Sequence, residues 1–431
     1  MVIGAVAGLQ NWGNIGTLDV QKNLIYGGVG SISNSLKVAS GITLDANNAA
    51  IHFTANSGSV ENQGNINGIL SLTGSNNAIT NAGVITGLIN SQAGNTLTNA
   101  GIINTLRVEK NLNYSGAGSI SDSAIIAENA ILDNTSALIF AGNSIAGLEN
   151  RGTIRGNVTN QGNMQSLINH GVMEGGITNS GKLENFENHK GAHTGDFVNV
   201  DSITKFVNNG AMANVTNQSS GVITSFLNNG TISGVVTNEK AGNNEGTIAN
   251  FANTGSIGSL QNDGHIATLQ NTGSIGTISN TSKNTIVALG NAEGATIEAV
   301  NNTGNINIIT NEGTINGQIT SQSGSVIEKI HIGANGVVNA KGQLDSSNIE
   351  DKANDAISLD TINTTLIHND GTISGNVRVV GDKSEIGELN NYKTINGCII
   401  LDGGNIGAIN NSGGIVSCMR FSNNATTEVN N

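Results

Sequence analysis

Apolar and polar residues alternate along this chain in a short repeated unit, which is clearest over residues 150–188. Units of ten and nine residues follow one another, so one complete repeat runs from Asn150 to Ile168 and the next begins at Asn169. Each unit begins with Asn-x-Gly and then places two apolar residues three or four positions apart, such as Ile154 and Val158. A recurring repeat of about 20 residues is typical of stacked architectures, in which each repeat buries its apolar side against its neighbours.

A unit of nine or ten residues has room for one short strand and one tight turn. The glycine can adopt a positive φ without a Cβ clash, as a sharp turn often requires. The apolar residues are mostly aliphatic or β-branched, which suits strands that face inward. The pattern therefore predicts an all-β chain folded as a parallel β-helix, or β-solenoid, with turns of roughly 18–20 residues stacked about 4.8 Å apart.

Two ladders are expected to follow the stacked turns. The opening Asn recurs at one corner of each turn, so its side chains can bond to one another as an amide ladder, which we expect on the lateral surface. Six apolar residues recur at one place in alternate units, with an insertion lengthening the last step, and should stack in the core: Leu148, Leu167, Phe186, Phe206, Phe226 and Phe251. This shared register favours an ordered repeat over a disordered Asn-rich tract.

We expect a single β-helix over residues 1–431, with less regular turns over 1–149 and regular repeats over 150–330. Two segments interrupt the pattern: an insertion at 238–245, and an excursion at 339–360 with clustered charges, interpreted as a loop or short helix outside the repeat. Terminal turns follow over 369–421. Units near 253–280 shorten to nine residues, which indicates a narrower turn. Since the first residues already resemble a repeat, we expect a fragment of a longer protein.

Composition supports this fold and excludes some partners. The 431 residues include no proline, although average usage predicts roughly 20, and proline cannot donate to a strand ladder. The net charge of −13 argues against nucleic acid as a partner. No apolar run approaches the ~18 residues of a membrane-spanning helix.

The only two cysteines, Cys398 and Cys418, are separated by the length of one turn. Each precedes an apolar residue expected to face inward, so both thiols should point outward on adjacent turns. The expected Cα separation of about 4.8 Å is within disulfide range. Both a disulfide and a free stacked pair fit this spacing. The disulfide is the favoured interpretation, because exposed free thiols are rare in oxidising compartments.

Histidines offer one candidate for metal binding. His170 and His189 are one complete repeat apart and follow successive corner Asn residues, so they should stack, with His193 and Asp196 nearby. This group could bind a metal weakly, but surface stacking is the more ordinary interpretation. No metal site and no cofactor are predicted.

Acidic residues are the candidates for a catalytic group. The densest set lies in the irregular segment, where the repeat does not bring it to one groove as polysaccharide-degrading enzymes require: Glu350, Asp351, Asp355 and Asp360. No serine nucleophile motif is evident. We therefore predict no catalytic residues and no enzymatic activity.

The repeated N-x-G-x-I-x-G-x-V-T unit, the absence of proline and the scarcity of cysteine resemble the passenger region of bacterial autotransporters. The Asn- and Ile-rich composition is similar to that of Campylobacter and Helicobacter passengers, and filamentous haemagglutinin-type adhesins have turns of similar length. The resemblance covers essentially the whole chain. It implies a right-handed parallel β-helix that is secreted through an outer-membrane β-barrel, which is not present in this chain, and displayed at the bacterial cell surface.

The function expected from this resemblance is adhesion to a host-cell receptor, matrix protein or glycan, or self-association. The alternatives are a passive stalk that presents a distal domain and, third, a β-helix enzyme that degrades polysaccharides. Recognition usually involves loops on a rigid scaffold, so the excursion supplies the candidate binding loop: Leu344, Asp345, Asn348, Glu350, Asp351, Lys352 and Asp355.

Overall fold

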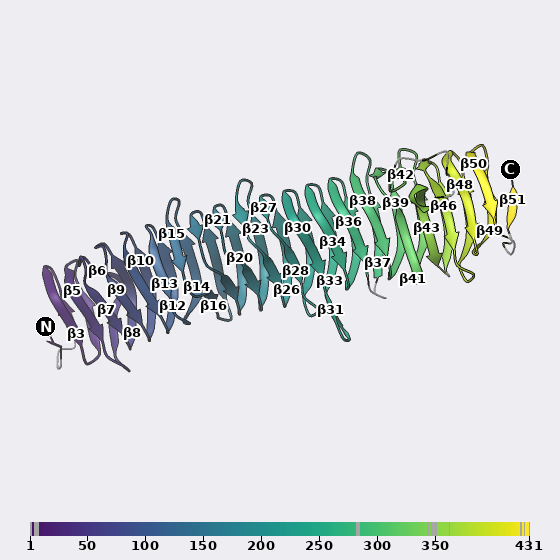
Figure 1. The fold of residues 1–431 in the computed structure, drawn as a ribbon. Coiled ribbons are helices and arrows are strands. Elements are labelled where there is room, and N and C mark those ends of the chain that lie inside the picture. The colour runs from purple at the N-terminus through teal and green to yellow at the C-terminus, as the bar shows by residue number, and fades with distance from the viewer. Residues whose placement is uncertain are drawn as a thin grey trace. The chain divides into compact units, whose positions relative to one another are not determined.

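The computed structural model describes residues 2–3, 8–281, 285–342, 345, 348, 351–361, 363–422, 425 and 427–430. Strands make up 67% of the described residues, and within each compact unit parallel strands stack as a β-solenoid, with about 20 turns in all (Figure 1). The chain divides into two compact units, one of residues 1–205 and 209–211 and the other of residues 206–208 and 212–431. The predicted parallel β-solenoid is therefore confirmed.

Regular turns of the first unit contain one long strand and two short ones. Asn150 pairs with Asn169, and Asn169 with Asn188, across the long strands. One turn therefore corresponds to one complete repeat, as predicted from the sequence. The strands of these turns are β17 (Ile145–Asn150), β18 (Thr153–Ile154), β19 (Val158–Asn160), β20 (Asn163–Asn169), β21 (Val172–Met173), β22 (Ile177–Asn179) and β23 (Lys182–Asn188).

In the second unit, the nine-residue repeats build turns from two strands of seven residues each. These strands are β33 (Thr247–Asn253), β34 (Ser256–Asn262), β35 (His265–Asn271) and β36 (Ser274–Asn280). Strand β33 pairs with β35, and β34 with β36, in parallel. Later strands of this unit are β37 (Thr285–Asn291), β41 (Ile319–Ile332), β42 (Val337–Asn339), β43 (Asp355–Thr361), β44 (Thr364–Asn369), β46 (Asn376–Val380), β47 (Glu385–Asn391), β48 (Thr394–Asp402), β49 (Asn405–Asn410), β50 (Ile415–Phe421) and β51 (Glu428–Asn430).

The interior of each unit is filled by aliphatic and phenylalanine side chains that are almost completely buried. In the first unit, Leu148 pairs in register with Leu167. In the second, the ring of Phe226 stacks between those of Phe206 and Phe251, with centroid distances of 4.7 and 4.4 Å. The expected apolar stack is therefore present within each unit.

The Asn residues that open the repeats form ladders, but these ladders are buried. Asn150 Nδ2 donates to Asn169 Oδ1 over 2.8 Å, and Asn169 Nδ2 donates to Asn188 Oδ1 over 2.9 Å. Asn150 Nδ2 also donates to the carbonyl of Val172, and its Oδ1 accepts from the N–H of Gly152. The expectation of a surface ladder is wrong, because the amides turn inward, where neighbouring turns satisfy their donors and acceptors.

A similar ladder runs within the second unit. Each of its amides donates to the next over 2.7–2.9 Å: Asn208, Asn228, Asn253, Asn271, Asn291 and Asn311. All are at most 2% exposed. In these turns, the opening Asn of the repeat is thus a core residue that links consecutive turns.

The glycine of the Asn-x-Gly corner allows the backbones of consecutive turns to approach closely. Gly273 is not among the glycines with positive φ, so the expected left-handed conformation is wrong at this corner. A Cβ at Gly273 would instead overlap the carbonyl oxygen of Gly255 in the preceding turn. That oxygen accepts a hydrogen bond from the N–H of Ser274 over 2.8 Å, so it cannot move aside without disturbing the ladder.

We predict that Gly273→Ala lowers the free energy of unfolding of the second unit by about 1–3 kcal/mol, as overpacking typically does. Chemical denaturation followed by circular dichroism measures this change. Gly342→Ala is the matched control, because space is open where its Cβ would lie, and it should alter stability by less than about 0.5 kcal/mol. Equal losses in both variants would contradict the close-approach explanation.

Candidate functional sites

The histidine pair in the first unit stacks as predicted. The ring centroids of His170 and His189 lie 3.9 Å apart, with an interplanar angle of 29°. Burial is the main cause that lowers the pKa of His170 below its ordinary value, followed by the neighbouring His189. His193 and Asp196, the possible further ligands, do not join the pair in a metal-binding group within the described part of the chain.

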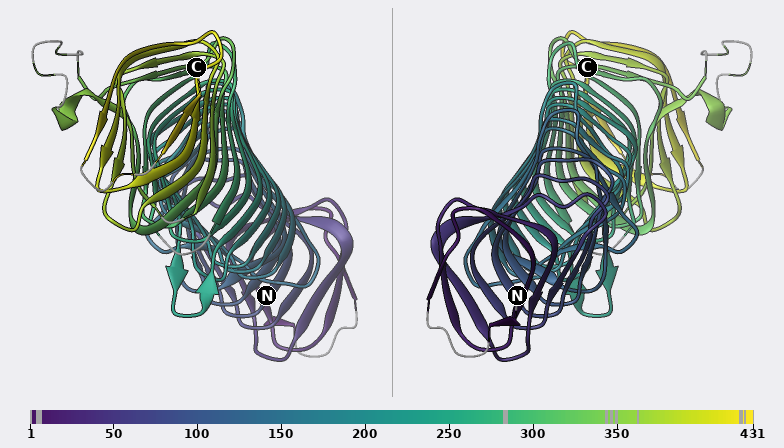
Figure 2. Two further views of the ribbon diagram at one scale, coloured as in Figure 1. Left: turned by 90° about the vertical axis from the view of Figure 1, so that its right-hand side faces the viewer. Right: turned by 90° about the vertical axis from the view of Figure 1, so that its left-hand side faces the viewer.

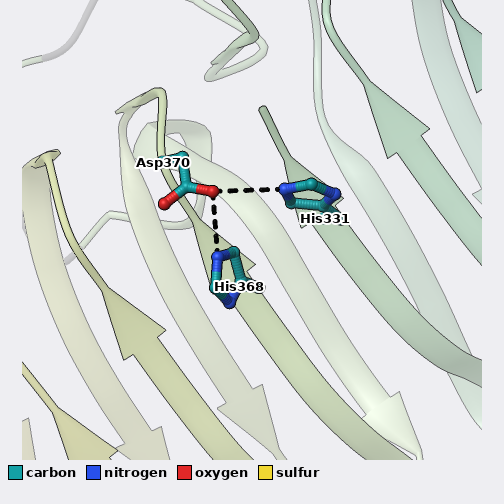
Figure 3. Close-up of side chains that lie close together, drawn as sticks. All are labelled: His331, His368 and Asp370. Atoms are coloured by element: carbon teal, nitrogen blue, oxygen red, sulfur yellow. Dashed lines mark hydrogen bonds and ion pairs between the residues drawn. The ribbon is translucent and has the colours of Figure 1, made fainter. Parts of the chain in front are cut away.

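A different histidine group lies in the second unit (Figure 3). His331 in β41 and His368 in β44 are register partners, and their rings are nearly perpendicular, with centroids 5.0 Å apart. Asp370 Oδ2 lies 2.9 Å from Nε2 of His368 and 3.3 Å from Nε2 of His331. Sequence reasoning missed this group because the excursion separates the two histidines by nearly two repeats instead of one.

The insertion at 238–245 forms a hairpin that projects from the turns of the second unit (Figure 2). Its antiparallel strands are β31 (Lys240–Ala241) and β32 (Asn244–Glu245), and all four of these residues are exposed. At the base, the N–H of Gly246 donates to the carbonyl of Glu239 over 2.7 Å. The inserted residues therefore leave the solenoid and return without shifting its register.

The second excursion is shorter than the predicted 339–360. Asn339 is the last residue of β42, and Asp355–Thr361 is strand β43, which pairs in parallel with β41 and β46. Between these strands the described residues include one three-residue 3-10 turn, Lys352–Asn354, drawn as the projecting coil in Figure 2. The predicted end of the excursion is too late, because the charged residues of β43 are typical of a loop but pair here within the sheet.

The side chain of Asn354 stabilises the base of this excursion through hydrogen bonds. This side chain is 1% exposed. Its Oδ1 accepts from the N–H of Asp345 over 2.8 Å, and its Nδ2 donates to the carbonyls of Asn348 and Asp345. Asp351 caps the 3-10 turn by accepting from the N–H of Ala353. An ordered base therefore supports the excursion.

The predicted loop residues divide into three groups. Asp345, Asn348, Asp351 and Lys352 are exposed and can contact a partner. Leu344 and Glu350 lie outside the described residues. Asp355 is 1% exposed, so its inclusion in a contact surface is wrong.

Asp355 belongs to a buried ion pair. Its Oδ2 accepts from Nε of Arg378 over 2.8 Å, and its Oδ1 accepts from Nδ2 of Asn376 over 3.2 Å. Burial raises the pKa of the Asp355 carboxyl above its ordinary value, while Arg378 and Asn376 act in the opposite direction. Removing one partner of such a pair leaves an uncompensated buried charge, so Asp355 supports the scaffold.

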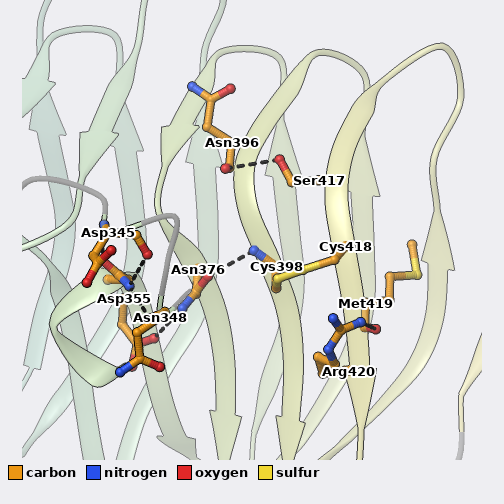
Figure 4. The surroundings of a disulfide bond; sticks show 11 residues. Asp345, Asn348, Asp355, Asn376, Asn396, Cys398, Ser417, Cys418, Met419 and Arg420 are labelled. Atoms are coloured by element: carbon orange, nitrogen blue, oxygen red, sulfur yellow. Dashed lines mark hydrogen bonds between the residues drawn. A yellow bond between two sulfur atoms is a disulfide. The ribbon is translucent and has the colours of Figure 1, made fainter. Parts of the chain in front are cut away.

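The same region contains a disulfide between Cys398 and Cys418 (Figure 4). The cysteines are register partners in β48 and β50, with Cα atoms 4.5 Å apart. The N–H of Cys398 donates to Oδ1 of Asn376 over 2.9 Å. The expectation that both cysteines face solvent is wrong for Cys398, which is fully buried. A register shift between Ile395 and Cys398 interrupts the strict alternation on which that expectation rested.

Beside the disulfide, a shallow depression of about 390 Å³ is lined by Arg378, Ile400, Leu401, Asp402, Arg420, Phe421 and Ser422. Phe421 is 44% exposed, and Arg420 is exposed beside it. Aromatic and arginine side chains are the residue types that most often anchor protein interfaces. Sequence reasoning placed no binding residues here, although the pair Arg420-Phe421 is a visible signal in a chain with few residues of either type.

The described part of the chain contains no helix with the length and apolar character that a membrane-spanning helix requires. No protein-family model, curated protein or solved structure matches this chain.

Proposed function

We propose that this chain is the passenger region of an autotransporter-type adhesin, displayed at the bacterial cell surface, and that it binds a host-cell, matrix or glycan receptor without catalysis. The observation that carries the proposal is the separation between a repetitive scaffold and two projecting segments. The apolar stack and the Asn ladders are buried in the scaffold. The hairpin and the excursion project from the second unit and present exposed charged residues.

This arrangement supports recognition on physical grounds. A specific interface generally needs about 800 Å² on each partner and a few well-placed anchors. The outward positions of the regular turns are mostly polar residues, with few of the aromatic and arginine side chains that serve as anchors. The projecting segments differ from the repeated surface of the turns, and their bases are hydrogen-bonded to the scaffold. They therefore present distinct side chains on a rigid support.

The test is binding of purified protein to host cells and matrix proteins. One variant deletes residues 240–245, whose flanking residues Glu239 and Gly246 are already hydrogen-bonded. A second, Lys341→Ala/Lys352→Ala, removes two exposed charges of the excursion. A deletion that extends to Asp355 is unsuitable, since it would remove the buried carboxylate that pairs with Nε of Arg378.

We expect each variant to weaken binding at least roughly fivefold, the effect of about 1 kcal/mol, with an unchanged circular dichroism spectrum. The control Lys182→Ala/Lys190→Ala removes the same charge from exposed positions of the first unit and should bind normally. Wild-type protein that binds no cell or matrix component at micromolar concentration would favour a passive stalk. Salt-dependent dimers with intact receptor binding in both variants would favour the solenoid face as the functional surface.

A further inference from the structure

We propose that His331, His368 and Asp370 form a surface binding site for a divalent transition-metal ion of the zinc class. Each residue offers one ligand atom, and these atoms all lie within 4.8 Å of one another. Asp370 Oδ2 is central to the group, at 2.9 and 3.3 Å from the two Nε2 atoms (Figure 3). The site rests on these residues alone and does not depend on the proposed adhesive function.

The donor set selects the class of ion. Imidazole nitrogen and carboxylate oxygen are usual ligands of Zn²⁺, whereas Ca²⁺ and Mg²⁺ prefer sites built from oxygen alone. With ligand bonds of about 2.0–2.2 Å, the ligand atoms of a tetrahedral ion lie roughly 3.4 Å apart. The observed separations around Asp370 Oδ2 are close to this value, so small side-chain rotations suffice to admit the ion. Three protein ligands leave a fourth position open to solvent.

The backbone holds the three ligands in place. His368 and Asp370 flank Asn369, which is fully buried and donates to Asn391 Oδ1 over 2.7 Å. The N–H of Asp370 donates to the carbonyl of Ile332 over 2.8 Å. Because the buried amide fixes the residues on either side of it, their side chains emerge at a defined place.

Ring orientation distinguishes this group from the other histidine pair. Among the described residues, His170 and His189 stack face to face, and no carboxylate completes a three-ligand group with them. His331 and His368 are nearly perpendicular, at 82°, which lets one edge of each ring approach the same oxygen atom. The ring of Tyr392 packs against that of His368, with centroids 5.1 Å apart.

A hydrogen-bonded His-Asp-His group that binds no ion is the competing explanation. Titration of the untagged full chain with ZnCl₂ in a non-coordinating buffer, followed by calorimetry, distinguishes the two. We expect saturable binding of one Zn²⁺ per chain at the proposed site. Substitution by Co²⁺ should add visible absorption bands typical of nitrogen and oxygen ligation.

His368→Gln and Asp370→Asn should each reduce Zn²⁺ affinity by at least roughly tenfold, the lower end of what removing even a supporting group costs. Because Asp370→Asn is nearly isosteric, it can still test the site if circular dichroism shows that His368→Gln does not fold. His170→Gln/His189→Gln is the matched control and should bind normally. The proposal is overturned if wild-type protein shows no saturable binding, if both site variants keep full affinity, or if only the control loses it.

Discussion

Phe226→Ala is expected to lower the free energy of unfolding of the second unit by about 3–5 kcal/mol, as phenylalanine truncation in a protein core does. The side chain is 1% exposed, and its ring contacts the rings of Phe206 and Phe251. Truncation removes the buried ring and leaves a cavity between two stacked aromatic neighbours. Because each solenoid turn contacts only adjacent turns, the loss should be concentrated in β29 (Val222–Asn228) and the strands paired with it.

Hydrogen exchange combined with urea denaturation measures this effect. Amides of β29 and β33 should exchange faster in the variant, while those of strands several turns away should change little. Val287→Ala in β37 is the control, since Val287 is 37% exposed, and it should cost no more than about 0.5 kcal/mol. Equal acceleration along the whole unit would contradict a local core stack.

Asn271→Leu should have the second large effect, although leucine has a similar size and is apolar. Asn271 is fully buried. Its Nδ2 donates to Asn291 Oδ1 and to the carbonyl of Thr296, each over 2.9 Å, and its Oδ1 accepts from Asn253 Nδ2 over 2.8 Å. Leucine would remove all three bonds and leave Asn291 Oδ1 without this donor, and a buried polar group that loses its partner costs about 1–3 kcal/mol. We expect a total loss on the order of 4 kcal/mol in denaturation experiments.

The matched control is Asn410→Leu. Asn410 takes part in an amide ladder of the same kind, between Asn390 and Asn430, but this ladder lies on the outer surface. Water can replace the lost partners there, so the cost should stay below about 1 kcal/mol. Similar losses at the two positions would show that burial does not determine the contribution of the ladder.

The two ladder predictions show where sequence reasoning succeeded and where it failed. The recurrence of Asn with apolar residues at fixed offsets was sufficient to predict stacked turns and amide-to-amide bonds, because both follow from register. It did not predict that the opening amides are buried. Asn271 lies two positions after the buried Leu269 and therefore faces inward, whereas Asn410 directly follows the buried Ile409 and faces outward. In the interior, Asn271 is satisfied by the side chains of Asn253 and Asn291 and by backbone carbonyls.

The candidate sites show the same division. The insertion at 238–245 and the excursion near 350 were recognised because they break the repeat. The sequence does not show which acidic residues of the excursion are exposed and which are buried. Asp351 and Asp355 are of the same type and lie close together in the chain. Arg378, 23 residues farther along the chain, pairs with Asp355 and makes it part of the scaffold.

The sequence by itself determined the all-β class, the length of the regular turn and the pairing of residues one turn apart, such as Cys398 and Cys418. These properties depend on local spacing, which the repeat records directly. Tertiary structure alone decided which polar residues are buried and which ligands converge. His331 and His368 become neighbours because the excursion leaves the solenoid and returns in register. Nearly two repeats of sequence therefore separate two residues that pair on adjacent strands.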